Sequence, residues 1–423
     1  MRIAIIAPGS RGDVEPYVAL GKGLVGAGHL VRLVTHEDFE ALVSTHGVEF
    51  WPLEGKVQEI AQSAAMRERL EKGSFVSVLR QMSRDAQDGA LVLAEGGLAA
   101  CKGMDLVLAG LGGLFTGLAL AEKLDLPLLQ AYYIPFTPTR AYPSFLLPEL
   151  PFRPSGVLNH LSYRVAQQMI WQGFRPADKL ARQQVLGLSP APVLGPFNSS
   201  RLRGMPVLYG FSSHVIPKAP DWDENTHVTG YWFLEGTGDF TPPPALEVFL
   251  ATGPPPLYIG FGSMSSRNPE ETASLILQAL ARTGQRAVML AGWGGLRATD
   301  LPDSVLMVDS VPFSWLFPRV AAVVHHGGAG TISHGLRAGV PSIVIPFFGD
   351  QPFWGRRVFE LGVGPEPVPR KKLTVERFSA AIEQALTDEA MRQRAAELGS
   401  QIRAEDGVGC AVAAVQQLEG RFG

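Results

Sequence analysis

Short apolar runs that alternate with helix-like stretches are the feature that most constrains the fold of this chain. Within the first 131 residues, such runs lie at 2–7, 29–35, 104–109 and 126–131. A strand that is apolar along its whole length is buried on both faces, as in a parallel sheet that helices cover on both sides. The alternation begins again at residue 256. The sequence therefore predicts an α/β protein with two Rossmann-like, doubly wound parallel-sheet domains.

The stretch between the two halves has the composition of an inter-domain connector, with prolines near both ends and many polar residues between them. We predict a first domain over residues 1–220, the connector over 221–244 and a second domain over 245–399. Residues 408–418 are rich in Ala and Val. We therefore expect residues 400–423 to include a helix that packs back on the first domain.

The composition excludes several classes of protein. Lys and Arg total 37 against 40 Asp and Glu, so no basic excess is available for a nucleic-acid backbone. Cys101 and Cys410 match neither a disulfide framework nor a zinc pattern. The most lipid-like stretch, 106–121, is shorter than the ~20 residues of a membrane-spanning helix. We expect a cytoplasmic protein without nucleic-acid partners, and the sequence leaves oligomeric state and membrane-surface attachment open.

Two short motifs lie in positions that do not suit their usual meaning. Gly21-Lys-Gly23-Leu-Val-Gly26 spells a dinucleotide fingerprint, but it lies late in a predicted helix and not in the turn after a strand. We interpret it as close helix packing. Asp221-Trp-Asp223 resembles a metal–nucleotide pattern but lies in the connector. Since His325 and His326 are adjacent on a strand and point to opposite faces, we predict no metal site and no cofactor.

Residues 325–331 (HHGGAGT) mark the point where a predicted strand ends and a helix begins. Small residues let the backbone approach a ligand closely, and a helix N-terminus offers unpaired N–H groups and a positive dipole end. These properties suit a diphosphate, with further donors from Thr331 and His326. The alternative is a glycine-rich turn whose histidines are hydrogen-bonded locally.

A carboxylate and an amide, Asp350 and Gln351, follow the end of the next predicted strand. Their acceptors and donors suit neighbouring sugar hydroxyls. Because open α/β sheets bind ligands at the carboxyl ends of their strands, we expect this pair beside the glycine-rich turn. The alternative is a pair of solvated turn residues.

An irregular segment over residues 132–174 is broken by prolines and rich in aromatic side chains. It is either a loop that covers core or the wall of an apolar ligand pocket. For the second alternative, the residues expected to line the pocket are Tyr132, Tyr133, Phe136, Tyr142, Phe145 and Trp171.

The chain resembles the GT-B glycosyltransferases of family 1, and more closely the sterol 3β-glucosyltransferases and the bacterial macrolide and glycopeptide glycosyltransferases. The resemblance rests on four motifs in order: GSRGDVEPYVALGKGL at 9–24, YIGFGSM at 258–264, DSVPFSWLFPRV at 309–320, and HHGGAGT…RAGVP…PFFGDQPFWG at 325–355. It implies a GT-B fold in which the N-terminal domain binds the acceptor and the C-terminal domain binds a nucleotide sugar across a cleft.

The resemblance also implies roles for particular residues. Asp13 matches the catalytic base, whereas its alternative role is the N-cap of the first helix. The backbone of Val311 would bind the nucleotide base, and Asp350 and Gln351 would hold the glucose hydroxyls. The remaining donor-binding positions are Ser10, Arg11, Gly12, Ser263, Ser310, His326, Gly328, Ala329, Gly330 and Thr331.

Two departures from the plant members leave the nucleotide open. Those members stack a Trp on the uracil at the position of Ser310 and hold the ribose with a Glu at the position of His334. We therefore expect either UDP-glucose or dTDP-glucose as the donor substrate.

The expected function is a metal-independent, inverting transfer of glucose to a hydroxyl of a hydrophobic acceptor such as a sterol, triterpenoid, polyketide or flavonoid. Asp13 would accept the proton, and the helix mouth with His326 would stabilise the leaving diphosphate. The alternatives are a sugar-nucleotide epimerase and a non-catalytic sugar-nucleotide-binding protein. If the acceptor is a lipid, contact with a membrane surface follows.

Overall fold

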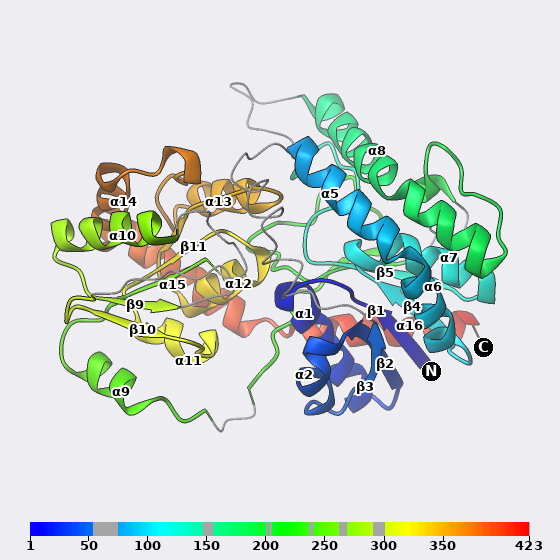
Figure 1. Ribbon diagram of the computed structural model, residues 1–423, viewed down its shortest axis with the longest axis horizontal. Helices are drawn as coiled ribbons and strands as arrows, with labels where there is room; N and C mark the ends of the chain where they lie inside the picture. The colour runs from blue at the N-terminus through cyan, green and yellow to red at the C-terminus, as the bar shows by residue number, and fades with distance from the viewer. Residues whose placement is uncertain are drawn as a thin grey trace. The chain divides into compact units, whose positions relative to one another are not determined.

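The computed structural model describes residues 1–53, 75–146, 155–199, 202, 205–236, 240–261, 269–290 and 301–422 (Figure 1). These residues form two compact units. The first unit holds the described residues of 1–53, 76–234 and 405–422, and the second holds those of 235–404. No helix within the described ranges combines the length and the hydropathy that crossing a bilayer requires.

The first unit is built on a seven-stranded sheet. Its strands are β1 (Arg2–Ile6), β2 (Leu30–His36), β3 (Glu49–Leu53), β4 (Leu106–Ala109), β5 (Leu128–Tyr132), β6 (Val207–Tyr209) and β7 (Thr226–Val228). They lie in the order β3-β2-β1-β4-β5-β6-β7, and all pairs are parallel. The central strands are the predicted apolar runs, and β4 is buried along its whole length.

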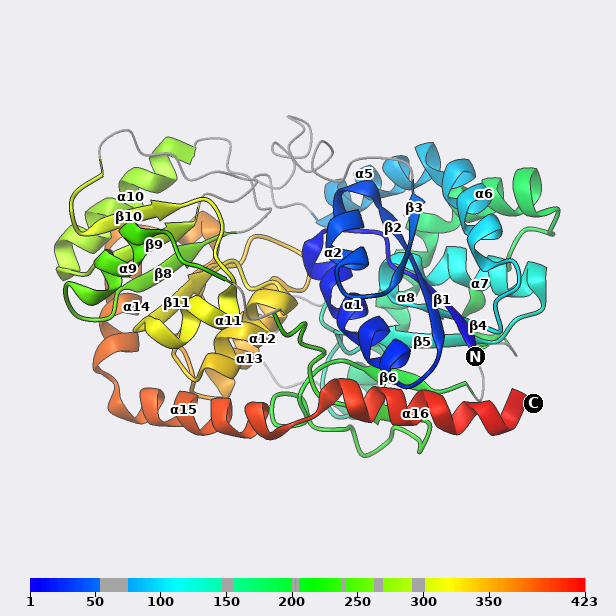
Figure 2. The same ribbon diagram turned by 90° about the horizontal axis from the view of Figure 1, so that it is seen from below.

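The helices of the first unit pack in two groups. α1 (Arg11–Gly26) contacts α2 (Glu40–Ser44) and α16 (Gly407–Phe422), while α6 (Ala90–Cys101) contacts α7 (Leu114–Leu124) and α8 (Gly156–Leu180). α5 (Phe75–Asp88) precedes α6, and a π-helical segment, η3 (Ala181–Leu186), continues α8. Figure 2 shows α16 running alongside α1.

The contact between α1 and α16 explains the glycine motif of the first helix. A Cβ atom added at Gly23 would lie 2.3 Å from a Val408 methyl carbon and 3.2 Å from a Val412 methyl carbon. Only glycine therefore allows the two helices to approach this closely. The interpretation of this motif as close helix packing is confirmed for Gly23, whereas a Cβ atom at Gly26 would meet no neighbouring segment within 4 Å among the described residues.

The second unit has five parallel strands: β8 (Leu257–Gly260), β9 (Ala287–Leu290), β10 (Val305–Val308), β11 (Ala322–His325) and β12 (Ser342–Val344). Their order is β10-β9-β8-β11-β12. The helices are α9 (Pro244–Ala251), α10 (Pro269–Thr283), α11 (Phe313–Leu316), α12 (Ala329–Ala338), α13 (Gln351–Glu360), α14 (Val375–Thr387) and α15 (Glu389–Ala404). Both units are thus doubly wound parallel α/β layers, which confirms the predicted fold class.

Alternate side chains of each strand in the second unit enter two different cores. On β8, Leu257 and Ile259 pack with residues of α10 and α14, whereas Tyr258 packs with residues of α9 and α11. β9 divides in the same way, with Met289 in the first core and Val288 in the second. Because side chains alternate across a strand, both faces must be apolar, and this is why the sequence shows continuous apolar runs.

Candidate active site

Each sheet has one point where its strand order reverses, and the predicted site residues follow strands at these points. In the first sheet the reversal lies between β1 and β4, and Asp13 lies in the first turn of α1, directly after β1. In the second it lies between β8 and β11, and the glycine-rich turn follows β11. Open α/β sheets bind ligands beyond the carboxyl ends of their strands at such points. The topology therefore places a candidate site on each unit.

Asp13 is held in a capping box at the start of α1. The N-cap is Ser10, and Asp13 is the third helical residue, so the alternative that Asp13 is the N-cap is wrong. Asp13 Oδ2 accepts hydrogen bonds from the backbone N–H and the hydroxyl of Ser10, each 2.7 Å long. This arrangement fixes one carboxylate oxygen against the helix terminus.

The other oxygen of Asp13 contacts a tyrosine that lies far away in the sequence and follows β5, two strands from β1 in the sheet. The hydroxyl of Tyr133, which follows β5, donates a hydrogen bond to Asp13 Oδ1. Among the described residues, these bonds use three of the roughly four acceptor positions of a carboxylate, and one on Oδ1 is left for an incoming hydroxyl. Asp13 is partly exposed, so a ligand can reach it.

Tyr17 packs against Tyr133 and so supports the pair that Tyr133 forms with Asp13. Its hydroxyl donates to the carbonyl oxygen of Ala131 at 2.6 Å, and its ring lies edge-on to that of Tyr133, with 6.4 Å between centroids. Burial, with the negative charge of Asp13, raises the pKa of Tyr17 well above its usual value. Tyr17 is therefore a neutral, fixed wall behind Tyr133.

The glycine-rich turn after β11 opens α12 as predicted. Gly328 is the N-cap, and the first helical bond runs from the Ile332 N–H to the Gly328 carbonyl. The N–H groups of Ala329, Gly330 and Thr331 consequently lack acceptors within the helix. The first turn of α12 carries no acidic residue. These features leave the positive end of the helix dipole available to an anion.

Two glycines shape this turn. Gly327 has a φ of +94°, which side-chain-bearing residues rarely adopt, and a Cβ there would lie 2.7 Å from Val344. A Cβ at Gly328 would lie 2.5 Å from Nε2 of His326. The His326 ring therefore lies directly over the helix start, and any larger residue at 328 must displace it.

The two histidines differ in their surroundings. His325 is fully buried, and its Nδ1 accepts a hydrogen bond from the Gly327 N–H at 3.0 Å. Burial, with the neighbouring His326, lowers the pKa of His325 to about 3. His326 is partly exposed, yet surrounding protein atoms lower its pKa to about 4. Both imidazoles are therefore neutral at pH 7.

Local hydrogen bonding satisfies these histidines only in part. Among the described residues, neither His325 Nε2 nor His326 Nδ1, both buried atoms, has a hydrogen-bond partner. The alternative is a turn whose histidines are hydrogen-bonded locally. Among the described residues, Nδ1 of His325 has such a bond, from the Gly327 N–H. A buried polar atom without a partner at a helix mouth is consistent with a ligand site.

Asp350 and Gln351 lie beside the glycine-rich turn. A Cβ at Gly327 would come within 3.1 Å of the Gln351 carbonyl oxygen. Asp350 is the N-cap of α13, and its Oδ2 accepts from the Trp354 indole at 2.9 Å. The buried side chain of Gln351 turns back, and its Oε1 accepts from the Phe347 and Phe348 N–H groups at 2.8 and 3.2 Å. The amide oxygen of Gln351 therefore orders the loop.

The other predicted donor residues are dispersed. Ser310 is exposed and Val311 is buried just after β10, where Phe313 packs edge-on against His334 of α12 at 5.7 Å. Arg11 and Gly12 are exposed at the start of α1, and Arg11 pairs with Glu15 at 2.7 Å. Ser263 lies outside the described residues.

The aromatic segment after β5 is packed tightly against α8. Tyr132, Phe136, Phe145 and Trp171 are buried, and Tyr132 contacts Phe136 ring to ring. Tyr133 and Tyr142 are partly exposed. The first four side chains form core here, so the assignment of all six residues to an acceptor pocket stays a prediction.

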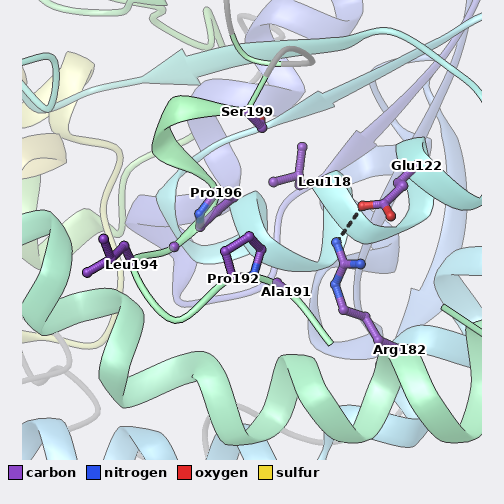
Figure 3. A pocket seen from close by; sticks show the side chains of 9 residues that line it. Leu118, Glu122, Arg182, Ala191, Pro192, Leu194, Pro196 and Ser199 are labelled. Carbon is purple, nitrogen blue, oxygen red and sulfur yellow. Dashed lines mark hydrogen bonds and ion pairs between the residues drawn. The ribbon is translucent and has the colours of Figure 1, made fainter. Parts of the chain in front are cut away.

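A cavity of about 310 Å³ lies elsewhere in the first unit (Figure 3). Its described lining includes Leu118 of α7 and the loop residues Pro192, Leu194 and Pro196. At one end Arg182 pairs with Glu122 at 2.6 Å. None of the six predicted aromatic residues is among its described lining residues.

Comparisons with known proteins agree with this architecture. The glycosyltransferase family 28 N-terminal domain matches residues 3–143, and the erythromycin biosynthesis protein CIII-like C-terminal domain matches residues 274–415. The solved glycosyltransferase of kitacinnamycin is similar, with a TM-score of 0.71 and 20% identity over 98% of each chain. VinC, solved in complex with dTDP, has a TM-score of 0.69 and 19% identity over 100% of each chain. The fold is therefore GT-B, and the chain is a glycosyltransferase.

Curated relatives define the family more narrowly. The chain is 38% identical to sterol 3-beta-glucosyltransferase UGT80B1 of Arabidopsis thaliana, over 97% of this chain and 67% of that protein. It is 37% identical to the sterol 3-beta-glucosyltransferase of Aspergillus fumigatus, over 98% of this chain and 30% of that protein. The chain belongs to the sterol 3-beta-glucosyltransferase family, as its motifs indicated. It spans less than a third of its fungal relative's length.

Proposed function

We propose that this chain transfers glucose from UDP-glucose or dTDP-glucose to a hydroxyl of a sterol-like, hydrophobic acceptor, with inversion at the anomeric carbon. The observation that carries the proposal is the 38% identity to a sterol 3-beta-glucosyltransferase over 97% of the chain. The two family models, which match residues 3–143 and 274–415, take in both candidate sites, the Asp13 turn and the start of α12.

The start of α12 binds the donor diphosphate in this proposal. Three N–H groups without helical acceptors, together with the helix dipole, favour an anion there. His326 is neutral at pH 7, so it supplies one N–H donor and no full charge. Asp350 and the Nε2 group of Gln351, whose Oε1 is bonded within the loop, hold the glucose hydroxyls. Backbone dipoles thus stabilise the negative charge that grows on the leaving diphosphate, and no metal is required.

Asp13 is the general base. The acceptor oxygen forms a bond to the anomeric carbon, while the bond from that carbon to the diphosphate oxygen breaks and its electron pair leaves with the diphosphate. The acceptor proton moves to Asp13 Oδ1, whose direction is set by the hydrogen bonds from Ser10 and Tyr133. General-base assistance of this kind contributes about 10²–10⁴-fold to a rate.

The test is direct incubation of the purified protein with UDP-glucose or dTDP-glucose and a panel of sterols, triterpenoids, polyketides and flavonoids. We expect a product with one added hexose, β-linked by NMR coupling, and the same rate in the presence of a chelator. The absence of product with every pair of substrates would contradict the proposal.

Two controls separate the alternatives. Conversion of the donor sugar without any acceptor would indicate an epimerase, and donor binding by calorimetry without turnover would indicate a binding protein.

We place the reaction in the cytoplasm, because both cysteines are free and Cys410 is exposed, which suits a reducing compartment. Cell fractionation tests this location.

A further inference from the structure

The outer face of α8 exposes an unusual concentration of apolar side chains. Eleven large hydrophobic residues among those described are exposed, and seven of them lie on α8 or on the loop beside it. Their exposed fractions range from 37% for Met169 to 77% for Leu194. We call this set the α8 apolar face: Val157, Leu158, Leu161, Val165, Met169, Val193 and Leu194.

The seven residues form one continuous surface. Residues 157, 161, 165 and 169 recur at every fourth position, so they share one side of the helix. The loop residues join them because the carbonyl oxygen of Val193 accepts from the Trp171 indole at 3.0 Å and from the Gln172 amide at 2.8 Å. A continuous exposed apolar surface of this kind marks an interaction site.

The inner face of the same helix already has its partners. Tyr163, Ala166 and Trp171 are buried, and the Gln167 amide donates to the Phe136 carbonyl at 3.2 Å. The Ser144 N–H donates to the Ser162 hydroxyl at 2.9 Å. α8 is therefore apolar on both sides, and the packing of the first unit explains only one of them.

The exposed charged residues of α8 itself are basic. Arg164 is exposed among its apolar residues, and Arg175 and Lys179 extend the same side of the helix. The acid of α8, Asp178, is buried and pairs with Arg182 at 3.2 Å. The neighbouring α5, whose Ser83 hydroxyl bonds to the Gly173 carbonyl, carries two arginines and two aspartates and so adds no net charge.

We propose that the α8 apolar face docks on an anionic lipid bilayer. Its apolar side chains enter the boundary between headgroups and acyl chains, while Arg164, Arg175 and Lys179 pair with lipid phosphates. A second copy of this chain fits less well, because a two-fold pairing of the same face would bring basic side chains together. The inference rests on the exposed face and not on the proposed acceptor.

Co-sedimentation with lipid vesicles, without donor or acceptor, tests the proposal. We expect the protein to bind vesicles of phosphatidylcholine mixed with phosphatidylglycerol, and to bind phosphatidylcholine alone more weakly. The double variant Leu161→Glu/Val165→Glu should lose binding by about tenfold or more, because two charges replace inserted side chains. Val248→Glu is the matched control, since Val248 is an exposed valine of α9 in the other unit.

A second variant guards against a folding defect in the first. Arg164→Gln removes only a surface charge, and it should weaken binding to the anionic vesicles and reduce its sensitivity to salt. Melting temperatures and calorimetric donor binding should match the unaltered protein in every variant used.

Three outcomes would overturn the inference. They are no binding of the unaltered protein to anionic vesicles, equal binding by the α8 variants, and a dimer in solution that Leu161→Glu/Val165→Glu dissociates. Because the readout needs no turnover, a failure of the proposed transferase activity would leave this test intact.

Discussion

Removal of the Tyr133 hydroxyl tests whether Asp13 is positioned as the general base. Tyr133 donates to Oδ1, the carboxylate oxygen with an acceptor position left for substrate, while Ser10 holds Oδ2. The variant Tyr133→Phe keeps the ring that lies edge-on to Tyr17. The change thus removes the hydrogen bond to Asp13 Oδ1 and leaves the aromatic ring.

The expected loss follows from the strength of such a bond. A hydrogen bond to a charged group contributes about 1.5–3 kcal/mol, which corresponds to roughly a 10- to 150-fold change in a rate or equilibrium. If the bond orients Asp13 for proton acceptance, kcat should fall within this range while the KM for acceptor stays within about twofold. If Tyr133 only lines an acceptor pocket, the KM should rise instead.

Steady-state glucosyl transfer at saturating donor and varied acceptor gives both constants. Tyr142→Phe, in the same segment with its ring edge-on to Trp222, is the matched control and should keep its kcat. In an Asp13→Asn background, Tyr133→Phe should add no further loss. An unchanged kcat in the single variant, or an equal loss in the Asp13→Asn background, would refute the reasoning.

Three further predictions concern the two candidate sites. Asp13→Asn should lower kcat by about 100-fold or more with little change in melting temperature, because an oxygen remains for the capping box; near-normal turnover would exclude Asp13 as the base. Gly328→Ala should weaken donor binding by about tenfold in calorimetry, because its methyl group displaces the His326 ring, and unchanged affinity would separate that ring from the donor site. The pKa values of His325 and His326 in the folded protein, about 3 and about 4, lie below the ordinary histidine value of 6.5. Below pH 6.5 the unfolded chain therefore binds more protons than the folded one, and the free energy of unfolding falls as the pH drops from about 6.5 toward 4. Denaturant titrations should show a shallower fall between pH 6.5 and 5 in His326→Gln, and an identical slope would assign the effect to other groups.

The sequence predicts the strands that form apolar runs of four or more residues and misses β3, β6 and β7. β1, β4, β8 and β11 are continuous apolar runs because cores lie on both sides. β3 (EFWPL) is an edge strand with Pro52 and mixed exposure, and β7 (THV) is polar. Each is an edge strand that pairs with the preceding strand of the chain. Such a strand is fixed by its contacts in the folded sheet, which an apolar pattern does not report.

The candidate site can be predicted from the sequence where its residues are close together in the chain. The spacing indicates that the turn at 326–331 and the Asp350–Gln351 pair are neighbours, as the structure has them, while their roles toward a ligand stay predictions. The alternative role of Asp13 as N-cap is wrong, because Ser10 is the N-cap. The signal for this was in the sequence, since Ser10 with an acid three residues later is the pattern of a capping box. The bond between Tyr133 and Asp13 joins residues 120 positions apart, and only the order of strands in the sheet brings them together.

The exposed side of α8 also escaped the sequence pattern. Residues 156–171 place apolar and polar side chains on both sides of the helix, so periodicity cannot show which side packs inward. The buried side chains and the loop at 193–194 decide this only in the folded chain.

The packing of α16 on α1 has a consequence for synthesis of the chain. α1 leaves the ribosome long before α16, yet the valines that cover Gly23 come from residues 408 and 412. Nearly the whole second unit is translated in between, and domains generally fold as units while synthesis continues. The second unit can therefore fold before α16 reaches the first unit. A fragment cut after residue 234 would leave the glycine side of α1 exposed.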